Sequence, residues 1–98
     1  MRVVAVGGRV FVNTLRLAGV GGVVAETVEE ATRAVNKLIQ NPEIGMLLVS
    51  DEYGEEFSKR LNELRSRLTV PIIYQIPAPG SEVRRVDYRA IMRQVLGI

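Results

Sequence analysis

The chain alternates short apolar runs with longer segments in which apolar residues recur at helical spacing. Continuous apolar runs cover residues 3–6 and 44–49, and weaker β-like runs cover residues 20–25 and 72–76. An apolar run without polar alternation is typical of a strand that is buried on both faces. The pattern therefore predicts four strands, and we expect the most hydrophobic run, 44–49, to be the central strand.

Each strand-like run is followed by a segment with the period of an amphipathic helix. The first of these segments places Phe11, Leu15 and Ala18 on one face, and Gly19 supplies a C-terminal stop. The next two stripes consist of Val28, Ala31, Val35, Leu38 and Ile39, and of Tyr53, Phe57, Leu61, Leu64 and Leu68. A Pro-Gly break then separates the last strand from a short fourth helix in residues 81–98.

Two of the predicted helices begin with capping signals. The Thr27 hydroxyl can accept the Glu30 N–H while the Glu30 carboxylate accepts the Thr27 N–H, which is a capping box. Ser50 is the expected N-cap of the third helix. The acidic residues that follow Ser50 would then lie in the first turns, where the helix dipole favours negative charge.

The resulting order, β-α-β-α-β-α-β-α, implies right-handed crossovers and a parallel sheet with helices on both faces. A four-stranded α/β sheet of Rossmann-like or flavodoxin-like type fits this order, with strands arranged 2-1-3-4. At 98 residues the chain corresponds to a single domain. We expect residues 1–77 to form its compact core and residues 81–98 a C-terminal helix that docks or moves.

Composition limits the chemistry that the chain can perform. Cysteine and histidine are both absent, which excludes disulfides, thiolate chemistry and catalysis by histidine. The net charge of +2 is too small to direct the whole chain toward nucleic acid, so an RNA-associated domain is the weakest hypothesis. No apolar run reaches the roughly 18 residues of a membrane span. We therefore expect no membrane insertion and a cytoplasmic location.

Neither glycine-rich segment contains a complete phosphate-binding motif. Gly7 and Gly8 follow the first strand, where a doubly wound fold often binds phosphate. The residues there read G-G-R-V-F-V, which matches neither G-x-G-x-x-G nor the Walker pattern. Residues 19–22 precede a strand, so no helix N-terminus would face an anion there. Both segments are interpreted as turns, and we expect no cofactor.

Four acidic residues follow the third strand, namely Asp51, Glu52, Glu55 and Glu56. The receiver domain of a response regulator carries its phosphoacceptor aspartate near this position. Such a domain also needs acidic residues after the first strand to hold Mg²⁺, where this chain has Gly7-Gly8-Arg9, and a lysine after a later strand. A helix-dipole role or a docking role therefore explains the group better. A receiver-like or small-ligand-binding regulatory domain is kept as the alternative function.

The polar side of the last helix is a row of arginines, Arg85, Arg89 and Arg93, at four-residue spacing. The apolar side consists of Ile91, Met92, Val95 and Leu96. A helix of this kind has to satisfy two different neighbours, and one of them can be another protein. Aromatic residues that could stack on bases are scarce nearby, which argues against a nucleic-acid partner.

Six segments along nearly the whole chain carry a family resemblance. They read VVAVGG at 3–8, LRLAGV at 15–20, VEEATRAVNKL at 28–38, IGMLLVSDEYGEE at 44–56, PIIYQIP at 71–77 and LGI at 96–98. Together they resemble the F subunit of the archaeal and vacuolar-type rotary ATPases (ATP synthases). One departure concerns the turn after the first strand. The family usually has an acidic turn there, roughly G-D-x-D-T, and this chain has Gly7-Gly8-Arg9-Val10-Phe11.

The resemblance implies a non-catalytic subunit of the central stalk, the rotor of the enzyme, that binds the coiled coil of the D subunit. It also implies that residues 83–98 can approach the catalytic A/B ring and modulate the coupling of ATP synthesis or hydrolysis to ion transport. Such a subunit is peripheral to the membrane as part of the ATPase complex. Together with the residue patterns, the resemblance leads to nine candidate interface residues: Arg16, Glu52, Glu55, Arg85, Arg89, Ile91, Met92, Arg93 and Leu96.

Overall fold

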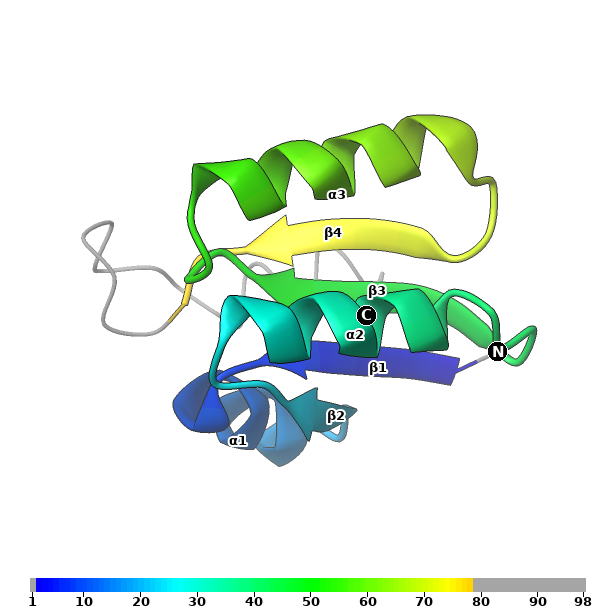
Figure 1. The fold of residues 1–98 in the computed structure, drawn as a ribbon. Coiled ribbons are helices and arrows are strands. Elements are labelled where there is room, and N and C mark those ends of the chain that lie inside the picture. The colour runs from blue at the N-terminus through cyan, green and yellow to red at the C-terminus, as the bar shows by residue number, and fades with distance from the viewer. Residues whose placement is uncertain (1, 79–98) are drawn as a thin grey trace.

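Four parallel strands form one sheet in the order β2-β1-β3-β4 (Figure 1). The structure is a computed structural model that describes residues 2–78. The strands are β1 (Arg2–Gly7), β2 (Gly21–Val24), β3 (Ile44–Ser50) and β4 (Ile72–Ile76). The helices are α1 (Arg9–Leu17), α2 (Val28–Leu38) and α3 (Glu55–Arg67). The α/β class and the predicted strand order are confirmed, and the predicted helix in residues 81–98 lies outside the described residues.

Strand β3 is buried along its whole length, as its uninterrupted apolar run predicts. Leu47 and Leu48 have no exposed surface, although successive side chains point to opposite faces of the sheet. Leu47 belongs to the hydrophobic cluster on one face, and Leu48 belongs to the cluster on the other. The sheet therefore needs apolar cover on both sides of its centre.

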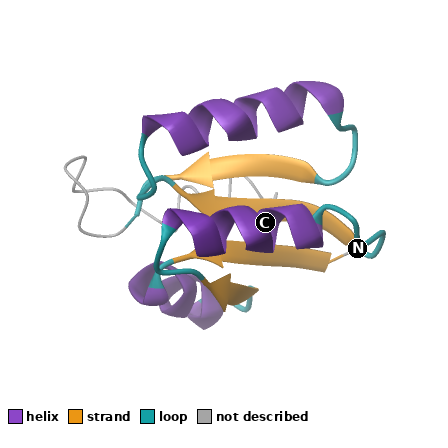
Figure 2. Ribbon diagram, in the orientation of Figure 1, coloured by secondary structure: helices purple, strands orange, loops and turns teal. Residues whose placement is uncertain are grey.

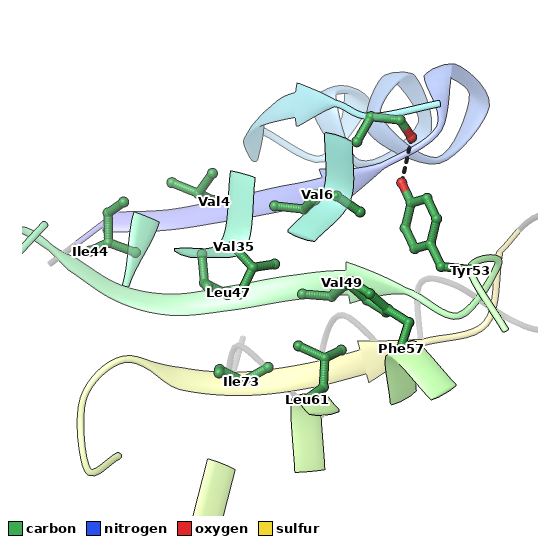
Figure 3. Packing of buried hydrophobic residues seen from close by; sticks show 12 residues of the cluster. Val4, Val6, Val35, Ile44, Leu47, Val49, Tyr53, Phe57, Leu61 and Ile73 are labelled. Carbon is green, nitrogen blue, oxygen red and sulfur yellow. Dashed lines mark hydrogen bonds between the residues drawn. The ribbon is translucent and has the colours of Figure 1, made fainter. Parts of the chain in front are cut away.

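Helices α2 and α3 lie on the same face of the sheet (Figures 1 and 2). Figure 3 shows side chains from both helices meeting those of β1, β3 and β4. Val35 of α2 packs there, and so do Phe57 and Leu61 of α3. The half-buried Leu64 borders this cluster, so most of the predicted α3 stripe faces the core.

Helix α1 covers part of the opposite face with Phe11, Val12 and Leu15. Its apolar face differs from the predicted one, because Val12 is buried and Ala18 is exposed. Ala18 follows the last residue of α1 and acts as its C-cap, so the helical period no longer points its side chain inward.

The capping box at the start of α2 is confirmed only in its first half. The Glu30 N–H donates to the Thr27 hydroxyl over 3.1 Å. The Glu30 carboxylate accepts from the Glu26 N–H over 2.8 Å, and not from Thr27 as expected. The return contact therefore reaches one residue further back along the chain and fixes the loop that enters α2.

The prediction that Ser50 caps the third helix is wrong. Strand β3 continues through Ser50, and α3 begins four residues later than this cap would require. Its N-cap is Gly54, which has a φ of 95° and contributes no side-chain cap. The two acidic residues directly after Ser50 thus form a loop at the sheet edge and do not belong to the first turn of α3.

Gly22 in β2 allows α1 to pack closely against the sheet. A Cβ atom placed on Gly22 would lie 2.8 Å from the Ala5 carbonyl oxygen and 3.1 Å from a methyl carbon of Val12. The same atom placed on Gly21 would meet nothing within 4 Å. The two adjacent glycines thus have different roles, although the sequence does not distinguish them.

We expect Gly22→Ala to lower the free energy of unfolding by about 1–3 kcal/mol, because overpacking a tight core forces its neighbours apart. Gly21→Ala is the matched control, and it should be neutral or slightly stabilising because it restricts the unfolded chain. Urea unfolding followed by circular dichroism measures both. Equal effects of the two substitutions would contradict the close packing of β1 and α1 around Gly22.

Candidate functional site

The candidate site lies at the carboxyl ends of β1 and β3. The chain leaves β1 toward β2 on one side and leaves β3 toward β4 on the other, so this is the topological switch point of the sheet. Folds of this type bind their ligands in the crevice at that point. The turn at Gly8 and the loop after Ser50 meet there.

The carboxylate of Glu52 occupies the position that a ligand anion would take. The Gly8 N–H donates to Glu52 Oε2 over 2.9 Å, and the buried Ser50 hydroxyl donates to the same oxygen over 2.6 Å. The Glu52 N–H in turn donates to the Ser50 hydroxyl over 3.3 Å. Because Gly8 is the N-cap of α1, Glu52 places a negative charge at the positive end of that helix.

A second carboxylate closes the same end of α1. The Arg9 N–H donates to Glu26 Oε1 over 3.2 Å. A Cβ placed on Gly8 would lie 2.6 Å from Glu52 Oε1 and 3.3 Å from Glu26 Oε1. Both carboxylates therefore fill the space in front of the helix, and an incoming phosphate would have to displace them against charge repulsion.

Asp51, the residue at the position of a receiver phosphoacceptor, is also engaged. Its carboxylate accepts from the Ala78 N–H over 2.9 Å. Its own N–H donates to the Ile76 carbonyl over 3.1 Å. Asp51 therefore holds the exit of β4 against the end of β3.

Tyr53 ties the loop after β3 to the end of β2. Its hydroxyl donates to the Ala25 carbonyl over 2.5 Å, and its ring lies 5.0 Å from that of Phe57 (Figure 3). Burial raises the pKa of the Tyr53 hydroxyl well above its ordinary value of 10.0, and the charges of Glu52, Glu26 and Glu30 raise it further. Tyr53 is therefore a neutral donor at physiological pH.

The structure brings together only part of the predicted interface. Glu52 and Glu55 lie close in sequence at the carboxyl edge, where Glu55 is the exposed first residue of α3. Arg16 is exposed in the last turn of α1, which runs away from that edge. The other six candidates, Arg85, Arg89, Ile91, Met92, Arg93 and Leu96, lie outside the described residues.

Sequence reasoning missed Glu26, Val10 and Leu17. Glu26 meets Arg9 across a separation of 17 residues, and no local motif signals that contact. Val10 and Leu17 are 63% and 91% exposed. Their signal was present in the sequence as a pair of apolar residues seven apart, on the side of α1 away from Phe11 and Leu15.

Residues 2–78 contain no group of three or more acidic side chains that could hold a metal ion. Within the same part of the chain, no helix combines the length and hydrophobicity needed to cross a membrane.

Comparisons with known proteins agree on the family. Residues 3–95 match the family described as the ATP synthase (F/14-kDa) subunit. The F subunit of the A-type ATP synthase of Methanothermobacter thermautotrophicus is 31% identical over 99 residues, covering 98% of this chain and 92% of the relative. The corresponding F subunit of Methanocaldococcus jannaschii is 27% identical over 100 residues, covering 100% of this chain and 97% of the relative.

Glu52→Ala should lower the free energy of unfolding by about 1–3 kcal/mol, because the Gly8 N–H and the Ser50 hydroxyl both lose their acceptor. Glu52→Gln keeps one acceptor oxygen and removes the charge, so it should lower the free energy of unfolding by less than Glu52→Ala does. Glu63→Ala, on the exposed side of α3, is the control and should be close to neutral. If Glu52→Ala and Glu63→Ala unfold at the same urea concentration, Glu52 does not support the turn.

Tyr53→Phe should lower the free energy of unfolding by about 1 kcal/mol near neutral pH, because the Ala25 carbonyl loses its donor. In the wild type the pKa of Tyr53 is higher in the folded than in the unfolded protein. The neutral hydroxyl therefore contributes stability that is fully present below pH 10 and is lost as the pH rises above that value. The variant lacks this titration, so the gap in stability between the two proteins should narrow above pH 10. Urea unfolding between pH 8 and pH 11 tests this, and a constant gap would contradict it.

Proposed function

The chain belongs to the family of the ATP synthase (F/14-kDa) subunit, and we propose that it is a non-catalytic part of the central stalk that binds the coiled coil of the D subunit. In this role it transmits and modulates the coupling of ATP synthesis or hydrolysis to ion transport. It works from a peripheral position in an A-type ATP synthase, on the cytoplasmic side of the membrane.

One observation carries this proposal beyond the family match. The crevice where this fold binds small ligands is filled by the Glu52 and Glu26 carboxylates of the protein itself. A domain that caps its own helix in this way has that ligand position occupied, which favours action through its surface. This supports a binding subunit over the receiver-like alternative, and the engagement of Asp51 with Ala78 supports it as well.

The proposed contacts come from two parts of the chain. Arg16, Glu52 and Glu55 belong to the described domain, and the row Arg85, Arg89 and Arg93 follows it. Ile91, Met92 and Leu96 would supply the apolar centre of the second contact. An apolar centre with arginine anchors is the usual composition of a protein interface. We further propose that residues 83–98 reach the catalytic A/B ring.

Complex formation with the D subunit of the same organism tests the proposal. The two proteins, each at full length, should elute together in size-exclusion chromatography at micromolar concentrations. Changing Arg85, Arg89 and Arg93 together to Glu should weaken the complex without lowering the thermal midpoint of the isolated protein. The matched control changes Arg33, Arg60 and Arg67, three exposed arginines of α2 and α3, in the same way. Failure of the wild type to bind would count against the proposal.

Calorimetric titration of the full chain with Mg²⁺, acetyl phosphate and ATP tests the receiver-like alternative. We expect no saturable binding of any of the three. A saturable site that responds to substitution of Glu52 or Asp51 would favour the alternative instead.

A further inference from the structure

The outward side of α1 exposes large apolar side chains, unlike a solvated helix. Val10 and Leu17 are 63% and 91% exposed, while Phe11, Val12 and Leu15 bury the opposite side of the same helix. Seven residues correspond to two helical turns, so Val10 and Leu17 lie one above the other about 10 Å apart. No large apolar side chain of α3 is as exposed as Val10 or Leu17.

The charges of α1 follow the same spacing. Arg9 and Arg16 are also seven residues apart, and both are exposed. No acidic residue lies within the helix, whose sequence is RVFVNTLRL. The α1 outer face, defined by Arg9, Val10, Arg16 and Leu17, therefore presents an apolar pair next to a cationic pair with the same separation.

We propose that the α1 outer face docks onto one long amphipathic helix of a coiled coil, with acidic side chains next to its apolar positions. A seven-residue spacing of apolar contacts matches the heptad repeat of such a helix. Carboxylates on the partner would pair with Arg9 and Arg16, which suit planar bidentate contacts. This inference rests on the proposed function, in which that helix belongs to the D subunit.

Charge argues against the other occupants of this face. A second copy of the chain would bring arginines against arginines. Residues 81–98 of the chain itself carry four arginines against two acidic side chains, so they are also cationic. Nucleic acid would meet Val10 and Leu17 where stacking or polar contacts are needed.

A groove of about 230 Å³ between α2 and α3 is a weaker docking surface. Val35, Phe57 and Leu61 line its floor but are already almost fully buried, so a partner would gain little apolar contact there. Two arginines and one glutamate, Arg60, Arg67 and Glu63, also line the groove, so its charge selects a partner less clearly than the two arginines of the α1 outer face do.

Affinity for the D subunit tests the proposal in the full chain. Changing Val10 and Leu17 together to Ser should weaken binding roughly tenfold or more, because such changes remove the centre of the contact. Val70→Ser is the matched control, since Val70 is 59% exposed at the opposite edge of the sheet. A variant with both Arg9→Glu and Arg16→Glu should also bind more weakly. Its loss of affinity should be larger at low salt than at high salt, because salt screens the charges.

Cross-linking locates the contact directly. The chain has no cysteine, so Leu17→Cys creates a single thiol for a benzophenone maleimide. Irradiation of the complex should attach this position to the D subunit, and Val70→Cys should not attach. Circular dichroism of each variant shows that the fold is retained.

The outcomes distinguish the docking face on α1 from the proposed function of the chain. Wild-type binding that the Val10 and Leu17 changes leave intact would overturn the docking face and leave the proposed function standing. A wild type that does not bind the coiled-coil partner would overturn both. A dimer of the isolated chain that the Leu17 change dissociates, or RNA binding lost with Arg9 and Arg16, would overturn the inference in favour of that occupant.

Discussion

The absence of any water-facing side on β3 is the constraint on which the rest of the structure depends. All seven residues of this strand are buried, so apolar cover must come from both sides of the sheet. The observed strand order meets this need, because crossovers in both directions from the centre of the sheet place helices on both of its faces. This arrangement brings the ends of β1 and β3 together and creates the crevice where related folds bind their ligands.

What fills this crevice distinguishes a ligand-binding domain from a module that acts through its surface. The backbone of this chain offers the same N–H groups at the start of α1 that other doubly wound proteins direct at phosphate. The Glu52 and Glu26 carboxylates accept these N–H groups, and the Ser50 hydroxyl donates to Glu52 and holds it in place. The family match and the filled crevice both support the proposal of a binding subunit. The first rests on sequence similarity, and the second rests on hydrogen-bond geometry.

The strand order and the central position of residues 44–49 could be predicted, because both depend on local apolar periodicity and on general crossover rules. The site could not, because the bond from Gly8 to Glu52 joins residues 44 apart, and no local rule links them. The sequence predicts the wrong role for Ser50, because a helix cap and the buried end of a strand look alike in sequence. The period of α1 indicates which side faces the sheet, but it does not indicate why Leu17 on the other side is apolar.

The internal capping of α1 has a consequence for how this domain responds to the cell. A protein that completes its fold by binding a phosphate metabolite becomes more stable as that metabolite accumulates and less stable as it is consumed. Here the Glu52 carboxylate accepts the Gly8 N–H, so the start of α1 needs no bound phosphate to satisfy that donor. The order of this turn then depends on side chains of the protein itself and not on the supply of a metabolite.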